Sequence, residues 1–184
     1  MRILFVDKVF LGAHRGEMLR GVEVFNLSFV KDLVEGGYHV DMVIASSWES
    51  VIRAKLGGAL PGFIRTYAWM PPQEIAGFLR DMDVLIVPSR DEEVMRETFS
   101  QAMVQGMLTG LPVLVHRLPV LEKKLEEGGG EVFDSIDELT AQMIRLADSP
   151  ETRREMGKAG RCTALNRYVW DTARFARRYL EASS

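Results

Sequence analysis

The stretch DVLIVPSRDEEVMRETFSQAMVQGMLTGLPVLV, residues 83–115, decides the fold class. It begins with DVLIVPS and ends with PVLV, two short and continuously apolar runs that are typical of strands covered on both faces. Between them lies a helical pattern that opens with Thr98-x-x-Gln101, a capping-box spacing, and closes at Gly110. We therefore expect a strand, a helix with Thr98 as its N-cap, and a second strand parallel to the first.

The same alternation of strand and helix patterns extends over the whole chain. Further strands are predicted at ILFV (3–6), HVDMVIA (39–45), IRTYAW (64–69) and, more weakly, EVF (131–133). Further helices are predicted at 22–37, 71–82, 135–150 and from about 151 to 182. Alternation at this spacing predicts a doubly wound, mostly parallel α/β sheet with C-terminal helices, in a single Rossmann-like domain over 1–184.

Composition indicates an ordinary globular protein. Of the 184 residues, 47% are apolar and 27% charged, and the net charge of −3 gives no basic field for nucleic acid. The single cysteine, Cys162, excludes an internal disulfide and fits a reducing compartment. The first apolar run is too short for a signal peptide, and no stretch approaches the roughly 18 apolar residues of a transmembrane helix. We expect a cytoplasmic protein without an integral membrane segment.

Ligands of open α/β sheets bind beyond the carboxyl ends of the strands. This rule selects the loops over 7–21 and 90–98 and the turn HRLP at 116–119. The first loop matches neither GxGxxG nor GxxxxGK[ST], so no dinucleotide or Walker-type site is predicted. Its Lys8 and Arg20 lie near an expected helix start, where an anion would bind favourably, but the pattern alone favours a loop of solvated surface charges.

The helix that follows the second loop carries an acid and an amide eight residues apart. We expect Glu97 just outside the helix and Gln105 about two turns in, roughly 12 Å along the axis. Gly106 costs about 1 kcal/mol relative to alanine inside a helix. A close neighbour, either a strand or a ligand, would account for that glycine. From the residues alone, this is either an ordinary capped amphipathic helix or a ligand site.

Residues 70–182 resemble the nucleotide-sugar-binding half of the retaining GT-B glycosyltransferases of family 4. The segment PPQEIAGFLRDMDVLIVPSR (71–90) is similar to that family's pattern P-x-E-L-x-x-x-Y-x-x-A-D-V-x-x-x-P-S. The segment ETFSQAMVQGMLTGLPV (97–113) is similar to its pattern E-x-F-x-x-x-x-x-E-A-M-x-x-G-x-P-V. Before it, GVEVFNLSFVKDLVEGGYHV resembles the opening of the family's acceptor-side domain. By this resemblance, residues 1–69 correspond to the opening of the acceptor-side domain and residues 70–184 to the donor-binding half. The whole chain would then form one Rossmann-like domain, which is half of a GT-B fold.

The resemblance implies a set of roles. Glu97 would lie by the donor sugar as the catalytic residue, and Gln105 stands where the family has the acid that holds the ribose hydroxyls. The remaining donor contacts that it implies are Thr98, the NH groups of Phe99 and Ser100, and the charges of Arg90 and Arg96. In an alternative register, Lys8 and Arg20-Gly21 are the basic phosphate contacts that open the donor domain. No metal and no cofactor are implied, because side-chain charge and NH dipoles offset the charge of the leaving diphosphate.

Three functions remain open at this point. The first is a metal-independent glycosyltransferase of the hexosyltransferase type, with a nucleoside diphosphate sugar as donor and an unknown acceptor. The second is a non-catalytic nucleotide-sugar-binding or partner-subunit module, which the amide at Gln105 and the missing acceptor region favour. The third is an unrelated doubly wound domain. In the first two, a second copy of the chain or a second glycosyltransferase subunit would supply the other wall of the cleft.

Overall fold

The computed structural model describes residues 2–5, 35–37, 41–45, 53, 62, 64–68, 70–89 and 99–169. Its strands are β1 (Arg2–Phe5), β2 (Asp41–Ala45), β3 (Ile64–Tyr67), β4 (Val84–Val87), β5 (Val113–His116) and β6 (Gly130–Phe133). Its helices are α3 (Pro72–Arg80), α4 (Gln101–Thr109), α5 (Pro119–Leu125), α6 (Ile136–Asp148) and α7 (Pro150–Arg167).

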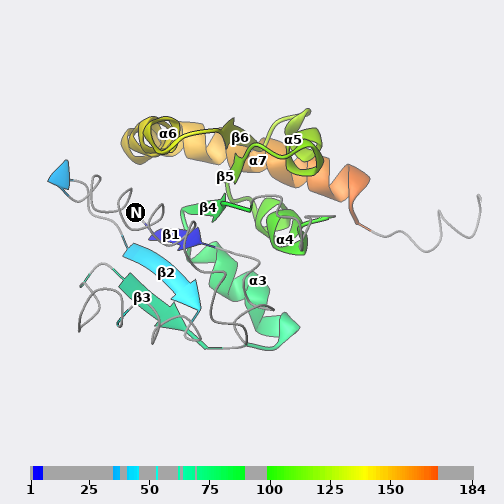
Figure 1. The fold of residues 1–184 in the computed structure, drawn as a ribbon. Helices are drawn as coiled ribbons and strands as arrows, with labels where there is room; N and C mark the ends of the chain where they lie inside the picture. Colours follow the sequence, from blue (N-terminus) through cyan, green and yellow to red (C-terminus); the bar gives the residue numbers. More distant parts are fainter. Residues whose placement is uncertain are drawn as a thin grey trace, which may run out of the picture.

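The six strands form one parallel sheet in the order β3-β2-β1-β4-β5-β6 (Figure 1). The order reverses between β1 and β4, where Ile3 pairs with Val84. The carboxyl ends of these two central strands therefore flank the topological switch point at which ligands of such sheets bind. The predicted doubly wound α/β class is confirmed, and strands from before and after residue 70 belong to the same sheet.

Each predicted strand is present, including the weak candidate that becomes β6, with ends that differ by at most a few residues. The predicted helix over 22–37 falls outside the described residues except at 35–37. There Gly37 has a φ of 85°, as expected for a glycine that ends a helix. The predicted helices over 71–82 and 135–150 are α3 and α6, and α7 occupies the described part of the predicted C-terminal helix.

One face of β4 and β5 forms a hydrophobic core cluster together with α3, α4, α5 and α7. The strand residues on this face are Leu85 and Val87 of β4 and Val113 and Val115 of β5. Met103 and Met107 of α4 are fully buried against them. Complete burial of a side chain of this size contributes about 1.5–3 kcal/mol, so α4 is held firmly along β4 and β5.

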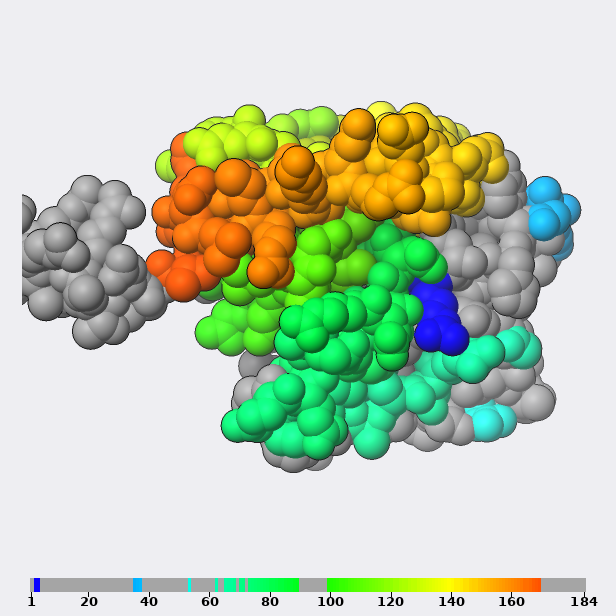
Figure 2. All heavy atoms as spheres, turned by 180° about the vertical axis from the view of Figure 1, so that it is seen from behind, coloured from blue at the N-terminus to red at the C-terminus, as the bar shows by residue number. Residues whose placement is uncertain are grey.

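Helix α7 packs across α4, with α3 on the other side of α4 (Figure 2). The two backbones meet through glycines: a Cβ added to Gly157 of α7 would lie 1.8 Å from the carbonyl oxygen of Gly110. A second close contact joins α7 to the turn before β6, where a Cβ added to Gly129 would lie 2.3 Å from the Cα of Gly160. Only glycine allows so close an approach of backbones. Among the described helices, α7 included, none is long and apolar enough to cross a membrane.

Candidate functional site at the start of α4

The start of α4, residues 99–101, lies at the carboxyl end of β4 beside the switch point. The helix begins at Gln101 with Ser100 as its N-cap, so the predicted N-cap at Thr98 is wrong. Ser100 has φ 50° and ψ 78°, a left-handed conformation that interrupts the helical backbone immediately before Gln101. Gln101 is thus the first helical residue and lies too early in the helix for the capping box that its spacing from Thr98 predicted.

This helix start leaves backbone donors available. The Ser100 side chain makes no capping hydrogen bond, and the first NH that is bonded within the helix is that of Val104, which donates to the Ser100 carbonyl at 3.3 Å. The NH groups of the first helical turn, beginning at Gln101, therefore point away from the helix at its positive end. Such an arrangement favours an anionic group, and its donors begin two residues later than an N-cap at Thr98 would place them.

Helix α4 has one buried and one exposed face. Gln101 and Gln105 are both exposed, and their spacing of four residues places them one above the other. Gln105 therefore lies one helical turn beyond the helix start rather than two. Gly106 is buried on the opposite side, where an added Cβ would lie 2.4 Å from Cδ2 of Leu85. The neighbour that accounts for the mid-helix glycine is thus strand β4.

A lysine and two aromatic rings hold the residue before the N-cap. Lys124 of α5 is only 5% exposed, and its Nζ lies 4.6 Å from the Phe99 ring centroid and 5.3 Å from that of Tyr168. The two rings meet edge to face at 6.0 Å. Burial raises the pKa of the Tyr168 hydroxyl. A partly desolvated cation over a ring contributes about 1–2 kcal/mol, so this cluster anchors Phe99 although its side chain is 42% exposed.

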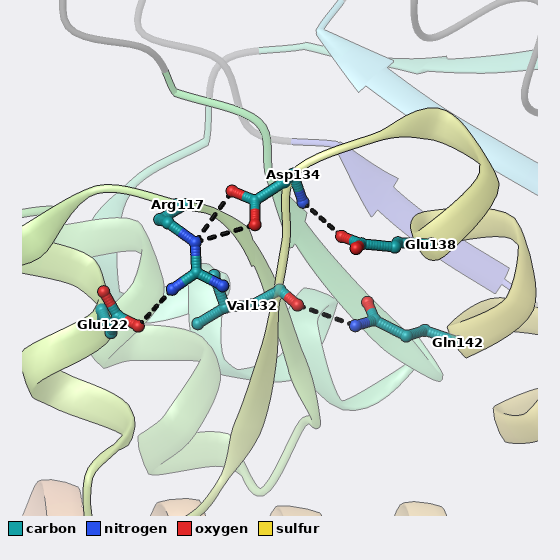
Figure 3. Close-up of polar contacts among 6 residues, drawn as sticks. All are labelled: Arg117, Glu122, Val132, Asp134, Glu138 and Gln142. Atoms are coloured by element: carbon teal, nitrogen blue, oxygen red, sulfur yellow. Dashed lines mark hydrogen bonds and ion pairs between the residues drawn. The ribbon is translucent and has the colours of Figure 1, made fainter.

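The carboxyl ends of β5 and β6 are joined by an ion-pair network (Figure 3). Arg117 Nε donates to both carboxylate oxygens of Asp134 at 2.8 Å, and its NH1 donates to Glu122 at 2.6 Å. The hydrogen bond with Asp134, followed by the charges of Asp134 and Glu122, raises the pKa of Arg117. Two carboxylates thus offset the one basic charge at this turn. The neighbouring His116 packs edge to face on Phe133 at 5.7 Å.

The structure brings only part of the predicted donor site into view. Phe99, Ser100 and Gln105 lie together at the start and along the first turn of α4. The other predicted site residues lie outside the described residues; they are Glu97, Thr98, Arg90, Arg96, Lys8 and Arg20. Within the described ranges, no three His, Cys, Asp or Glu side chains are grouped closely enough to hold a metal ion.

Two residues at this site were missed from the sequence. Gln101 was assigned to the capping box, and the pattern gave no reason to pair it with Gln105. Lys124 had a usable signal: it follows Leu121 by three residues and therefore continues the apolar stripe of α5. A lysine at such a position is a candidate for burial, and lysine is almost never fully buried unless its charge has a partner.

The sequence of the chain is similar to those of known glycosyl transferase-like proteins. The sequence pattern of the glycosyl transferase-like family matches residues 27–180. The MMP alpha-(1->4)-mannosyltransferase of Mycolicibacterium hassiacum is 29% identical over 123 residues, which are 65% of this chain and 28% of that protein. The trehalose synthase of Rubrobacter xylanophilus is 31% identical over 88 residues, 48% of this chain and 20% of that protein. The chain thus matches less than a third of the length of either relative.

Solved structures share the fold. Sucrose-phosphate synthase from Thermosynechococcus elongatus superposes with a TM-score of 0.70 at 16% identity over 100% of this chain and 46% of that one. The C-terminal domain of a group 1 glycosyl transferase from Francisella tularensis gives 0.66 at 13% identity over 92% of this chain and 87% of that one. HepE from Anabaena in complex with UDP gives 0.67 at 12% identity over 98% of this chain and 48% of that one.

Proposed function

Since the chain belongs to the glycosyl transferase-like family, we propose that it binds a nucleoside diphosphate sugar at the start of α4 and transfers the sugar, with retention of configuration, to an acceptor. One observation carries the proposal: the helix start with unbonded NH groups lies at the carboxyl end of β4, beside the switch point of the sheet. The HepE structure, which contains UDP and has the same fold, supports a nucleotide as part of the ligand.

In this proposal the diphosphate faces the NH groups of the first turn of α4. The helix dipole and these donors offset the charge that develops on the leaving diphosphate, so no metal ion is required. Glu97, two residues before Phe99, orients the donor sugar, and Arg90 adds positive charge. Lys8 and Arg20, which follow β1 in the sequence, are proposed as further phosphate contacts.

Gln105 is proposed to hold the ribose. It is exposed one turn beyond the helix start, and its amide both donates to and accepts from hydroxyl groups. Thr98, Phe99 and Ser100 line the approach to it. The acceptor would bind against a second wall, supplied by another copy of the chain or by a second glycosyltransferase subunit, because the family resemblance implies a cleft between two domains.

Thermal unfolding in the presence of UDP-, GDP- and ADP-sugars tests the donor site. A ligand at about 100 times its Kd stabilises the folded state by about 2.7 kcal/mol, which raises the Tm measurably. Glu97→Ala and Gln105→Ala are expected to reduce this shift, and Gln105→Glu to enlarge it by adding a charged acceptor for the ribose hydroxyls. Glu155→Ala, on the exposed face of α7, is the control and leaves the shift unchanged. No shift with any of the sugars would overturn the proposal.

A second function is favoured by the neutral amide of Gln105. A non-catalytic module would bind the nucleotide sugar and serve as the partner of an active subunit. Donor hydrolysis and transfer to candidate acceptors separate the two functions. Binding without either reaction, in the wild-type protein and in Gln105→Glu, supports the module; sugar transfer by the wild type supports the enzyme.

A further inference from the structure

The start of α4 carries a conformation that needs support. Ser100 is the one residue other than glycine, among those described, with a positive φ. A side chain with a Cβ adopts this region reluctantly, because the Cβ approaches the following carbonyl oxygen. Contacts on the flanking residues must therefore hold the backbone in this state.

Those contacts come from α5 and α7 through Phe99. The Lys124 ammonium lies over the Phe99 ring and beside the Tyr168 ring, and its Nζ also donates to the Val120 carbonyl at 3.3 Å. Tyr168 is the C-cap of α7, and Lys124 lies in the last turn of α5. The residue before the N-cap of α4 is thus attached to two other helices, whose neighbouring ends Figure 1 shows near α4.

We propose that Lys124 is a positioning residue: by holding the Phe99 ring against Tyr168 it orders the start of α4, and thereby sets the affinity of the donor site. The inference rests on the proposed function for its donor part. Lys124 acts through the Phe99 ring and does not have to contact the donor. The ammonium acts on the ring, the ring fixes the backbone at 99–100, and that backbone fixes the direction of the NH groups of the first turn of α4.

Two variants isolate this effect. Lys124→Met keeps the apolar stem but removes the charge, and Lys124→Arg restores a cation that stacks well on rings. Lys123→Met is the matched control, because Lys123 is the exposed neighbour in the same helical turn. Thermal unfolding of all four proteins shows first that each variant is folded.

Hydrogen exchange of the peptide over 97–105 tests the ordering independently of any ligand. Lys124→Met is expected to speed exchange at the first bonded amides of α4, beginning at Val104, by about fivefold or more, because a lost ring contact lowers the free energy of local opening. Lys124→Arg is expected to restore most of the protection, and Lys123→Met to leave it at the wild-type value. Equal exchange in Lys124→Met and the wild type would overturn the inference.

Donor affinity tests the second half. With the nucleoside diphosphate sugar that most stabilises the wild type, Lys124→Met is expected to raise the Kd about tenfold, which corresponds to about 1.4 kcal/mol at 25 °C. Lys124→Arg should recover most of this loss. If exchange rises while the Kd stays unchanged, Lys124 supports the fold only, and the inference is overturned. If the wild type binds no such sugar, the proposed function and the donor part of this inference fall together, while exchange still decides the ordering of α4.

Discussion

The residues that flank α4 at its two ends share a left-handed backbone conformation but differ in what stabilises it. Both the residue before the helix and the residue after it have a positive φ, 50° at Ser100 and 83° at Gly110. At the C-terminal end the residue is glycine, which adopts this conformation without a Cβ clash, and its NH donates to the carbonyls of Gly106 and Met107. At the N-terminal end the residue is serine, whose own side chain makes no capping hydrogen bond.

The surroundings of the two ends of α4 also differ: the C-terminal end contacts backbone, and the N-terminal end contacts side chains. The backbone at Gly110 packs against Gly157 of α7, where there is no room for a side chain because an added Cβ would lie 1.8 Å from the Gly110 carbonyl oxygen. Ser100 adjoins Phe99, which is held by side chains and remains partly exposed. Backbone strain of about 1–3 kcal/mol is typically retained where a function needs it. The C-terminal end of α4 is thus built for stability, and the N-terminal end carries strain at the proposed donor site.

The largest effect is expected from Gly157→Ala, which breaks the stable end. The new Cβ would overlap the Gly110 carbonyl oxygen, and because the Cβ is bonded directly to the α7 backbone and the oxygen belongs to the Gly110 backbone, α7 must move away from α4. The free energy of unfolding in urea is expected to fall by about 3 kcal/mol or more. The control is Gly77→Ala on α3, where an added Cβ meets nothing within 4 Å and stability should rise by about 0.5–1 kcal/mol. Similar changes in both variants would contradict the backbone contact.

Single substitutions of the two residues that flank α4 test whether their positive φ values have different costs. Gly110→Ala is expected to destabilise the protein by about 1–2 kcal/mol, since alanine is strained at a positive φ. Ser100→Gly relieves that strain but adds freedom to the unfolded chain, so a net gain of about 0.5 kcal/mol is expected. Urea unfolding of the two single variants gives both values. A loss of stability in Ser100→Gly would show that the serine side chain, rather than strain, dominates at the N-terminal end.

A smaller effect is expected in the middle of the helix. Gly106→Ala gains about 1 kcal/mol of helix propensity but forces the Leu85 side chain to repack at a cost of about 1–3 kcal/mol. We expect a net loss of about 1 kcal/mol in the free energy of unfolding. Adding Leu85→Val, which removes the overlapping Cδ2 atom, should recover part of the loss in a double-mutant cycle. Strictly additive effects would show that the two residues are not in contact.

The smallest effect is expected at the exposed network that joins the ends of β5 and β6. Arg117 and Asp134 each have about half of their side chain exposed, at 50% and 48%, so solvent screens their attraction. Arg117→Gln is expected to leave the midpoint of thermal unfolding close to that of the wild type. Because two carboxylates already offset this charge, the donor-induced shift in Tm should also persist. Loss of that shift would make Arg117 part of the donor site.

Much of this architecture could be predicted because it depends on local patterns. Continuous apolar runs identified the strands, and the glycine at Gly110 identified the end of α4. The start of α4 could not be predicted correctly, because the spacing from Thr98 to Gln101 fits a capping box that the left-handed Ser100 prevents. Arg117 and Asp134 are 17 residues apart and meet only because β5 and β6 are neighbours in the sheet.

The sequence by itself determined the α/β class, the segments that form the six strands and the helices α3, α4, α6 and α7, and the family, because all of these depend on residue order and short spacings. Only the tertiary structure decided which groups meet. It showed that the mid-helix Gly106 serves a strand, that Gln105 is exposed one turn into α4, and that Lys124 reaches Phe99 from another helix. Such contacts depend on how separate elements pack, and packing is a property of the whole chain rather than of any single segment.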